Sequence, residues 1–351
     1  MKNKQRIISL VVAILVGLLL TSTLNIFAQT EAINSIDKFL TDSEKNGFNG
    51  VVLIIKGEKV LLRKGYGVAD CQGKRKITPE MIFDIGSITK NITTFAILKL
   101  QAQGKLQIND SISKHLKNVP SDKANITIEQ ILQHTAGMPD VFGADEDYVS
   151  KDWFIRKAFS EALISPPGAK REYSNAGFSL LGAIIEELSG QSYETFVRKN
   201  VLDPAGINQT GYFLPKLKKN NIVCGILDDK PWGNVKDYYG KFEPSWHLLA
   251  NGGMLSSVNE LDKWFRAVLD NKIVPVEITN IWLATTGRKT LRNTRYIATS
   301  GSNHIFSSLY IRYIDDDASF VLFTANSKWQ KEKVQPQLLA ELNKIILGDK
   351  K

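Results

Sequence analysis

The sequence predicts an α/β protein, of the α+β kind, in which one antiparallel sheet is flanked by helices and carries a largely helical insertion. Runs rich in β-branched and aromatic residues lie near both ends of the chain, at residues 50–63 and 296–325. Short turns separate these runs, as expected for antiparallel neighbours. Between them, most segments of residues 87–239 show apolar residues at helical spacing.

The N-terminal part of the predicted sheet domain consists of a helix and a hairpin. Residues 31–45 carry apolar side chains at helical spacing. The runs Gly50–Ile55 and Lys59–Arg63 are separated by three turn-forming residues and predict a β-hairpin. A turn at residues 77–80 then leads into the apolar run Met81–Ile85.

The middle of the chain predicts a succession of helices. We expect them at residues 87–100, 127–132, 152–164, 176–188 and 193–201. Prolines and a glycine at residues 166–168 separate the third from the fourth. Residues 208–239 are rich in Lys, Gly, Asn and Asp and are predicted to be loop.

The C-terminal part returns to the sheet. We expect a helix at residues 258–269, strands at residues 296–300, 306–313 and 319–325, and a closing helix at residues 331–347. Sequential strands joined by short turns belong in one sheet. We therefore assign residues 29–86 and 240–351 to one α/β domain and residues 87–239 to a mainly helical domain. A ligand cleft is expected at the seam between them.

The first 28 residues have the three-part pattern of a secretory signal peptide. Three cations within the first six residues precede the apolar run Ile7–Leu20, and Ala28 follows as a plausible cleavage point. The apolar run is shorter than the ~20 residues of a comfortable membrane span. We expect an exported protein, periplasmic or extracellular, with an uncleaved N-terminal membrane anchor as the alternative.

The composition argues against nucleic-acid and metal partners. The chain has 351 residues and a formal net charge of +9, and its cations are scattered apart from Lys216-Leu217-Lys218-Lys219, a cluster more typical of a solvated loop than of a nucleic-acid site. The four histidines show no metal-ligand spacing, and no motif implies a cofactor. Cys71 and Cys224 either form a disulfide or are both buried unpaired. The sequence does not predict the oligomeric state.

Ser87 and Lys90 form the first candidate catalytic pair. Residues three apart share one face of a helix, so these side chains can meet. A serine hydroxyl needs a base within hydrogen-bond reach to act as a nucleophile. A lysine becomes such a base when burial lowers its pKa. The same Ser-x-x-Lys pattern also describes an ordinary helix start followed by a solvated lysine.

Five segments in order decide between these interpretations. They are residues 64–70 (Lys-Gly-Tyr-Gly-Val-Ala-Asp), 83–90 (Phe-Asp-Ile-Gly-Ser-Ile-Thr-Lys), 131–139 (Ile-Leu-Gln-His-Thr-Ala-Gly-Met-Pro), 173–177 (Tyr-Ser-Asn-Ala-Gly) and 251–257 (Asn-Gly-Gly-Met-Leu-Ser-Ser). Together they resemble the serine β-lactamase and penicillin-binding-protein superfamily, in its class C-like branch. The resemblance spans roughly residues 45 to 345.

The resemblance implies a role for each motif residue. Ser87 would be the nucleophile that becomes acylated, and Lys90 its proton acceptor. Tyr173 would share the role of base and then protonate the leaving group. Asn175 would orient Lys90 or bind a substrate amide. The segment around His134 would be a structural turn beside the cleft rather than part of a catalytic triad.

The third element of the family departs from its usual pattern. Its counterpart here is Thr299-Ser300-Gly301, followed by Ser302, and a threonine stands where relatives carry lysine or histidine. Thr299, Ser300 and Gly301 are nevertheless expected to border the substrate. The backbone N–H groups of Ser87 and Ser302 would form the oxyanion hole, because backbone donors do not depend on side-chain identity.

The predicted function is that of an exported serine hydrolase that forms an acyl-enzyme on Ser87. Because the third element lacks a cation, small neutral esters or amides are favoured, with cell-wall D-alanyl peptides as further substrates. Arg295 or His304 could replace the missing charge. The alternatives are a β-lactamase and a catalytically inert module that binds a ligand or partner.

Overall fold

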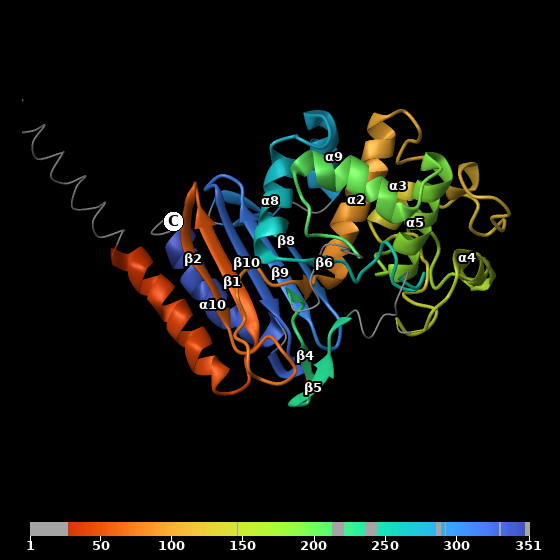
Figure 1. Ribbon diagram of the computed structural model, residues 1–351. Helices are drawn as coiled ribbons and strands as arrows, with labels where there is room; N and C mark the ends of the chain where they lie inside the picture. Colours follow the sequence, from red (N-terminus) through yellow and green to blue (C-terminus); the bar gives the residue numbers. More distant parts are fainter. Residues whose placement is uncertain are drawn as a thin grey trace, which may run out of the picture.

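Both ends of the chain contribute to one six-stranded antiparallel sheet (Figure 1). The computed structural model describes residues 27–145, 147–212, 221–235, 244–285, 289–291, 293–329 and 331–347. The strand order is β2-β1-β10-β9-β8-β7. These strands are β1 (Gly50–Lys56), β2 (Lys59–Tyr66), β7 (Lys289–Leu291), β8 (Thr294–Ser302), β9 (Ser307–Tyr313) and β10 (Ala318–Thr324). The predicted fold class is confirmed.

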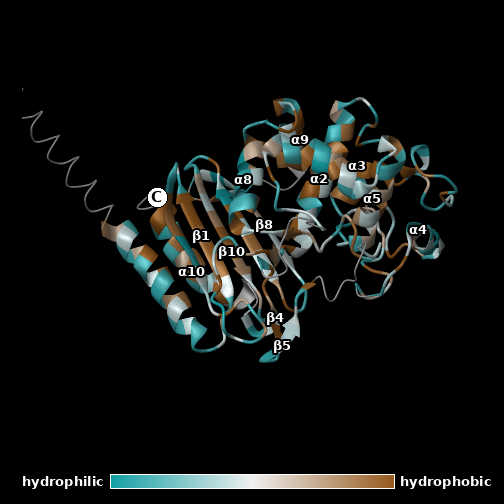
Figure 2. Ribbon diagram, viewed as in Figure 1, coloured by the Kyte–Doolittle hydropathy of each residue, from teal (hydrophilic) through white to brown (hydrophobic). Residues whose placement is uncertain are grey.

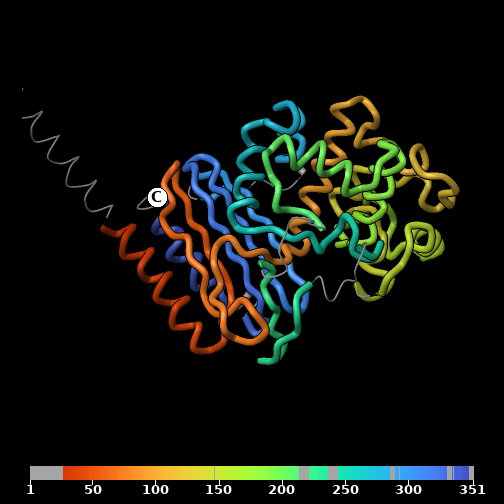
Figure 3. The backbone as a smooth tube through the Cα atoms, in the orientation of Figure 1, coloured from red at the N-terminus to blue at the C-terminus, as the bar shows by residue number. Residues whose placement is uncertain are grey.

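Strand β1 joins the N-terminal hairpin to the C-terminal strands. Gly50 lies opposite Thr324, and Lys56 lies opposite Ala318. Figure 3 shows the resulting contact between the orange and blue ends of the chain. Strands β9 and β10 are buried along their whole length, because layers of helix cover both faces of the sheet. Strand β10 accordingly reads as an almost continuous apolar run rather than an alternating one (Figure 2), whereas β9 includes the buried polar residues Ser307, Ser308 and Arg312.

The two faces of the sheet are covered by different helices. An N-terminal helix (residues 27–44) and α10 (Lys331–Leu347) pack on one face, where Ile36 and Leu338 share a core with alternate residues of β1 and β10. Helix α8 (Val258–Leu269) covers the other face. The core on that side continues without interruption into the helical part of the molecule. The predicted domain boundaries stay a prediction.

Helix α2 is the centre of the helical part. It is buried at ten of its fourteen residues, as expected for a helix surrounded by others. It packs against α5, α6 and α9. The helices of this part are α2 (Thr89–Ala102), α3 (Ile128–Leu132), α4 (Lys151–Ser160), α5 (Asn175–Ser189), α6 (Tyr193–Val197) and α9 (Val276–Thr285), with the 3-10 turn η1 (Gly86–Ile88) before α2.

Local sequence signals fix where the site-bearing helix α5 begins and ends. The Ser174 hydroxyl accepts a hydrogen bond from the Gly177 N–H at 2.9 Å, which satisfies one of the free donors of the first turn. Gly190 ends the helix in the left-handed conformation, with φ of 67°. Tyr173 and Asn175 are therefore held at a fixed helix start rather than in a loop.

Several elements differ from the sequence-based expectations. Helix α9 was not predicted, and α4 ends at Ser160 rather than residue 164. Residues 208–239, predicted to be loop, contain the strand pair β4 (Gly225–Leu227) and β5 (Lys230–Gly233). A second short pair, β3 (Phe83–Asp84) and β6 (Leu255–Ser256), aligns the segment before Ser87. Strands this short carry no readable alternation.

Cys71 and Cys224 form a disulfide, so the paired alternative is the correct one. The bond joins the loop after β2 to the residue before β4, and the Cα atoms are 5.4 Å apart. None of the helices in the described part of the chain is both long and apolar enough to cross a bilayer. The predicted signal segment lies outside the described residues, apart from its last two.

Candidate active site

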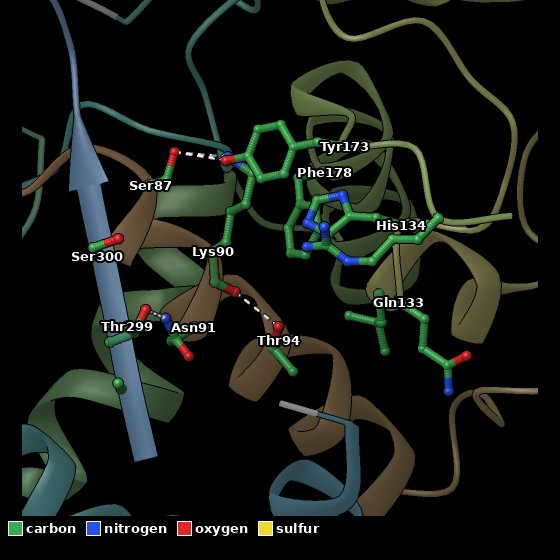
Figure 4. A pocket seen from close by; sticks show the side chains of 13 residues that line it. Ser87, Lys90, Asn91, Thr94, Gln133, His134, Tyr173, Phe178, Thr299 and Ser300 are labelled. Atoms are coloured by element: carbon green, nitrogen blue, oxygen red, sulfur yellow. Dashed lines mark hydrogen bonds between the residues drawn. The ribbon is translucent and has the colours of Figure 1, made fainter. Parts of the chain in front are cut away.

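A pocket opens between the start of α2, the start of α5 and strand β8 (Figure 4). Its volume is about 350 Å³, at the lower end of the range of about 300–1,000 Å³ that small-molecule sites occupy. It is lined by Ser87, Lys90, Asn91, Thr94, Leu132, Gln133, His134, Arg171, Tyr173, Phe178, Ala298, Thr299 and Ser300. The sequence-predicted residues Ser87, Lys90, Tyr173, Thr299 and Ser300 thus share one cavity.

The hydroxyl of Ser87 is contacted by both predicted proton-transfer groups. Lys90 Nζ lies 3.2 Å from Ser87 Oγ, and the Tyr173 hydroxyl donates to the same oxygen at 2.7 Å. Figure 4 shows the Tyr173 hydroxyl directed at Ser87. Both distances are within the range needed for proton transfer.

The surroundings of Lys90 fix the direction of its lone pair. Lys90 Nζ donates to Asn175 Oδ1 at 2.5 Å and to the backbone oxygen of Asn251 at 2.6 Å. A neutral amine has two hydrogens and one lone pair. With both hydrogens engaged, the lone pair of a neutral Lys90 is left for Ser87. Asn175 therefore orients Lys90, and the Asn251 backbone oxygen, within the family motif at residues 251–257, is the second acceptor.

The pKa values of the two groups shift in opposite directions. Burial lowers the pKa of Lys90 to about 7, although the carboxylates of Asp140 and Asp145 oppose this shift. Burial raises the pKa of Tyr173 to about 12. At neutral pH a large share of Lys90 is therefore an amine that can accept a proton, while Tyr173 stays protonated and can donate one.

His134 supports Tyr173 and does not act on Ser87. The two rings stack with centroids 4.5 Å apart, and His134 Nδ1 accepts a hydrogen bond from the Ser174 N–H at 3.1 Å. Burial and the neighbouring cations Lys90 and Arg171 lower the pKa of His134 to about 3, so the ring is neutral. This placement agrees with the predicted structural turn.

The backbone of strand β8 lies directly against the backbone of residues 85–87. A Cβ atom on Gly301 would lie 2.1 Å from the Ile85 oxygen and 2.5 Å from the Ser87 nitrogen, so only glycine fits. A Cβ on Gly86 would lie 2.7 Å from the Ser302 nitrogen. Gly301 and Ser302 are thus beside the Ser87 backbone, outside the pocket lining, and the two-amide oxyanion hole remains a prediction.

The family model described as Beta-lactamase matches residues 36–302. The chain belongs to the beta-lactamase family. It is 31% identical over 245 residues to Protein flp of Staphylococcus aureus (strain COL), which covers 65% of this chain and 47% of that protein. It is 26% identical over 347 residues to Penicillin-binding protein 4* of Bacillus subtilis (strain 168), covering 88% of this chain and 75% of that protein. The chain spans about half the length of the staphylococcal relatives.

Solved structures of beta-lactamase-family proteins share the fold. The octameric penicillin-binding protein homologue from Pyrococcus abyssi superposes with a TM-score of 0.76 at 23% identity, covering 91% of this chain and 79% of that one. FmtA from Staphylococcus aureus gives 0.73 at 22% identity, with 91% and 89% covered. A class C beta lactamase gives 0.72 at 18% identity, with 89% and 98% covered. The family consists mostly of serine hydrolases and acyltransferases.

Within this beta-lactamase-family site, the missing charge of the third element is not replaced as expected. Arg295 Nε donates to Asp315 Oδ1 at 2.8 Å, and Arg295 lies at the far end of β8. His304 packs edge-on against Trp232, with ring centroids 6.3 Å apart. Neither residue lines the pocket, so both expectations were wrong. Thr299 Oγ1 instead accepts a hydrogen bond from Asn91 Nδ2 at 2.9 Å.

Arg171 is the pocket cation that sequence reasoning missed. It lines the cavity two residues before Tyr173 and has no ion-pair partner among the described residues. Within the described lining, Lys90 and Arg171 are the lysine and arginine side chains, and no carboxylate accompanies them. The only available signal was its closeness to Tyr173 in the sequence. As for metals, no three His, Cys, Asp or Glu residues of the described ranges gather into a possible binding group.

Proposed function

We propose that this protein is a serine hydrolase that cleaves small esters or amides through an acyl-enzyme on Ser87. The observation that carries the proposal is the convergence of Lys90 Nζ and the Tyr173 hydroxyl on Ser87 Oγ, at 3.2 and 2.7 Å. A nucleophile contacted by a poised base and by a proton donor has the geometry of acyl transfer. An inert binding module has no need of this arrangement.

The first half-reaction follows from these contacts. Ser87 Oγ attacks the substrate carbonyl carbon while its proton passes to Lys90 Nζ. The resulting oxyanion is stabilised by the backbone N–H groups of Ser87 and Ser302. When the intermediate collapses, the bond to the leaving group breaks. The leaving group takes its proton from the Tyr173 hydroxyl, which is reprotonated by Lys90.

The second half-reaction repeats the steps with water. Lys90, again neutral, accepts a proton from a water molecule that attacks the acyl carbon. The bond to Ser87 Oγ then breaks, the serine oxygen takes that proton from Lys90 Nζ, and the acid is released. Where another alcohol or amine replaces water, the same site would act as an acyltransferase.

Arg171 favours D-alanyl peptides as a second class of substrate. A guanidinium group binds a carboxylate strongly and directionally. Because Arg171 lines the pocket without an ion-pair partner among the described residues, it could bind the terminal carboxylate of a peptide from the wall opposite β8. Neutral substrates were favoured because the third element lacks a cation, and Arg171 now supplies a cation from another part of the pocket. A β-lactam also carries a carboxylate, so β-lactamase activity remains the alternative function.

Export is part of the proposal. The first 28 residues have the pattern of a secretory signal. The disulfide between Cys71 and Cys224 also supports export, because such bonds persist mainly in oxidising compartments.

The test is hydrolysis of p-nitrophenyl acetate by the protein without residues 1–28, beside Ser87→Ala. We expect turnover that falls at least about 10³-fold in the variant. A serine adduct with benzylpenicillin, detected by mass, would extend the activity to β-lactams. Equal rates in both proteins, together with no Ser87 adduct from a reactive phosphonate, would contradict the proposal and favour a binding module.

A further inference from the structure

A buried carboxyl group lies behind the nucleophile, outside the pocket. Asp84 is the last residue of β3 and is 2% exposed. Its Oδ1 accepts a hydrogen bond from the Gly86 N–H at 2.6 Å, and its Oδ2 accepts one from Asn303 Nδ2 at 3.1 Å. None of the proton transfers described above uses this group. Proton transfer therefore does not explain why a carboxyl group is buried behind Ser87.

The side chain of Asn303 is oriented by its own hairpin. Its Oδ1 accepts hydrogen bonds from the backbone N–H groups of Ile305 at 2.8 Å and Phe306 at 2.6 Å, in the loop that joins β8 to β9. Because both of these groups are donors, the amide oxygen must face them. The amide NH2 group must therefore face Asp84, and an acceptor is required there.

These hydrogen bonds link the two segments that meet behind the Ser87 nucleophile. Gly86 immediately precedes Ser87, and Asn303 immediately follows Ser302. The segments are in direct backbone contact, since a Cβ on Gly86 would lie 2.7 Å from the Ser302 nitrogen. Asp84 thus bonds one residue next to each of the two N–H groups that would form the oxyanion hole.

We propose that Asp84 and Asn303 form a positioning pair that sets the relative placement of the Ser87 and Ser302 N–H groups. The inference rests on the proposed function, in which those groups stabilise the oxyanion. Such donors must lie about 2.7–3.1 Å from the oxygen that becomes charged. A misplacement of about 1 Å is enough to cost about 10²-fold in rate.

The cost of burying Asp84 supports this role. Burial raises the pKa of Asp84 to about 7, and the nearby carboxylate of Asp145 adds to the shift, whereas the hydrogen bonds from Gly86 and Asn303 oppose it. A buried carboxyl group is an expensive way to fill space. In its ionised form it offers two accepting oxygens to two donors at once.

A swap of the two side chains tests the pair. Asp84→Asn places an NH2 group against the NH2 group of Asn303, and Asn303→Asp places two carboxyl groups together. The double variant Asp84→Asn/Asn303→Asp restores one donor facing one acceptor, and every backbone N–H named above keeps its acceptor. A positioning pair therefore predicts two impaired single variants and a recovered double variant.

The measurement is the affinity of phenylboronic acid, together with kcat and KM for p-nitrophenyl acetate. Ser87 Oγ bonds to boron as its proton passes to Lys90, and a hydroxyl on boron then takes the place of the oxyanion. We expect each single variant to bind the boronic acid about 10²-fold more weakly, with kcat reduced similarly and KM little changed. The double variant should bind the boronic acid at least about tenfold more tightly than either single variant.

Asp262→Asn provides the matched control. Asp262 is also a buried carboxyl group, 4% exposed, and accepts hydrogen bonds from Arg266 at 2.8 Å and Tyr310 at 3.3 Å. It lies on α8, away from the pocket lining. We expect this variant to lower the thermal midpoint without changing boronic acid affinity. A general loss of stability is thereby separated from an effect on the oxyanion hole.

Two results would overturn the inference. One is single variants that lose thermal stability but keep the boronic acid affinity of the unchanged protein. The other is a folded double variant that recovers none of the affinity, which also decides the matter if Asp84→Asn alone does not fold. Failure of the proposed function looks different, because the unchanged protein would then show no Ser87-dependent hydrolysis or boronic acid binding.

Discussion

The two walls of the cleft are built on different principles. On the helical wall, Ser87, Lys90, Tyr173 and Asn175 act through side chains that contact one another at 2.5–3.2 Å. On the wall formed by β8, the Gly301 backbone contacts the nucleophile segment directly, and the cation usual at the third element is absent. The catalytic side chains can therefore be complete while the means of recognising substrate differs from that of relatives.

Among the variants that compare the two walls, replacing Lys90 should cause the largest loss of activity. Lys90→Met keeps the length of the side chain but removes the proton acceptor of the helical wall. We expect kcat for p-nitrophenyl acetate to fall about 10³-fold with little change in KM. The natural control is Lys99→Met on the same helix, whose Nζ donates to the Ile273 oxygen away from the pocket. Turnover by Lys90→Met within threefold of the unchanged protein would remove Lys90 from the mechanism.

Gly301→Ala tests the backbone contact of the β8 wall. The added methyl group would overlap the Ile85 oxygen and the Ser87 nitrogen, so the strand must move away. We expect a loss of about 10²-fold in kcat, because the N–H group of Ser302 moves with the strand. Ser300→Ala on the next residue removes a side chain without this overlap and should cost less than about tenfold. Similar losses of kcat in Gly301→Ala and Ser300→Ala would show that the close backbone contact at Gly301 does not contribute to catalysis.

Arg171→Gln tests whether the helical wall, rather than β8, binds the carboxylate of a substrate. We would compare two N-acylglycyl esters that differ only in the leaving group, D-lactate or its amide. The variant should lose about tenfold in kcat/KM for the carboxylate-bearing ester alone. Lys170→Gln, which alters an exposed neighbour paired with Glu172, should affect neither ester. Equal losses on both esters would exclude selective carboxylate binding by Arg171.

Thr299→Val should have the smallest effect. It removes the hydroxyl that accepts the hydrogen bond from Asn91 but keeps the shape of the side chain. Because neither residue contacts Ser87, we expect kcat to change less than about threefold and the free energy of unfolding to fall by about 1 kcal/mol. Denaturant unfolding and p-nitrophenyl acetate kinetics would measure both. A loss approaching that of Gly301→Ala would mean that this side chain itself contributes to catalysis.

The residues of the helical wall could be predicted for two different reasons. Ser87 and Lys90 share a helix face, so their spacing alone allows them to meet. Tyr173 and Asn175 were predicted from the family resemblance, and the structure places both at the capped start of α5. Arg171 and the Asn251 backbone oxygen could not be found in this way. That Arg171 lines the pocket, and that the Asn251 oxygen reaches Lys90, depends on how separate segments pack, which no short window of sequence encodes.

The errors on the sheet side have a similar cause. Arg295 and His304 were chosen for their basic side chains and their closeness in sequence to Thr299, but Arg295 is at the far end of β8 and His304 lies in the turn between β8 and β9. Helix α9 was missed because its β-branched residues disfavour a helix. Packing of Trp282 against Phe95, with ring centroids 5.2 Å apart, outweighs that preference.

The central claim is that a buried, neutral Lys90 activates Ser87. The measurement that tests it most directly is the rate at which p-nitrophenyl acetate acylates Ser87 in a single turnover, followed from pH 5 to 10 with Ser87→Ala as the blank. Because the pKa of Lys90 is lowered to about 7, the amine form grows as pH rises through that value. The account predicts a rate that rises about tenfold per pH unit below 7 and levels off above it. A rate that keeps rising to pH 10, or shows no dependence on pH, would contradict it.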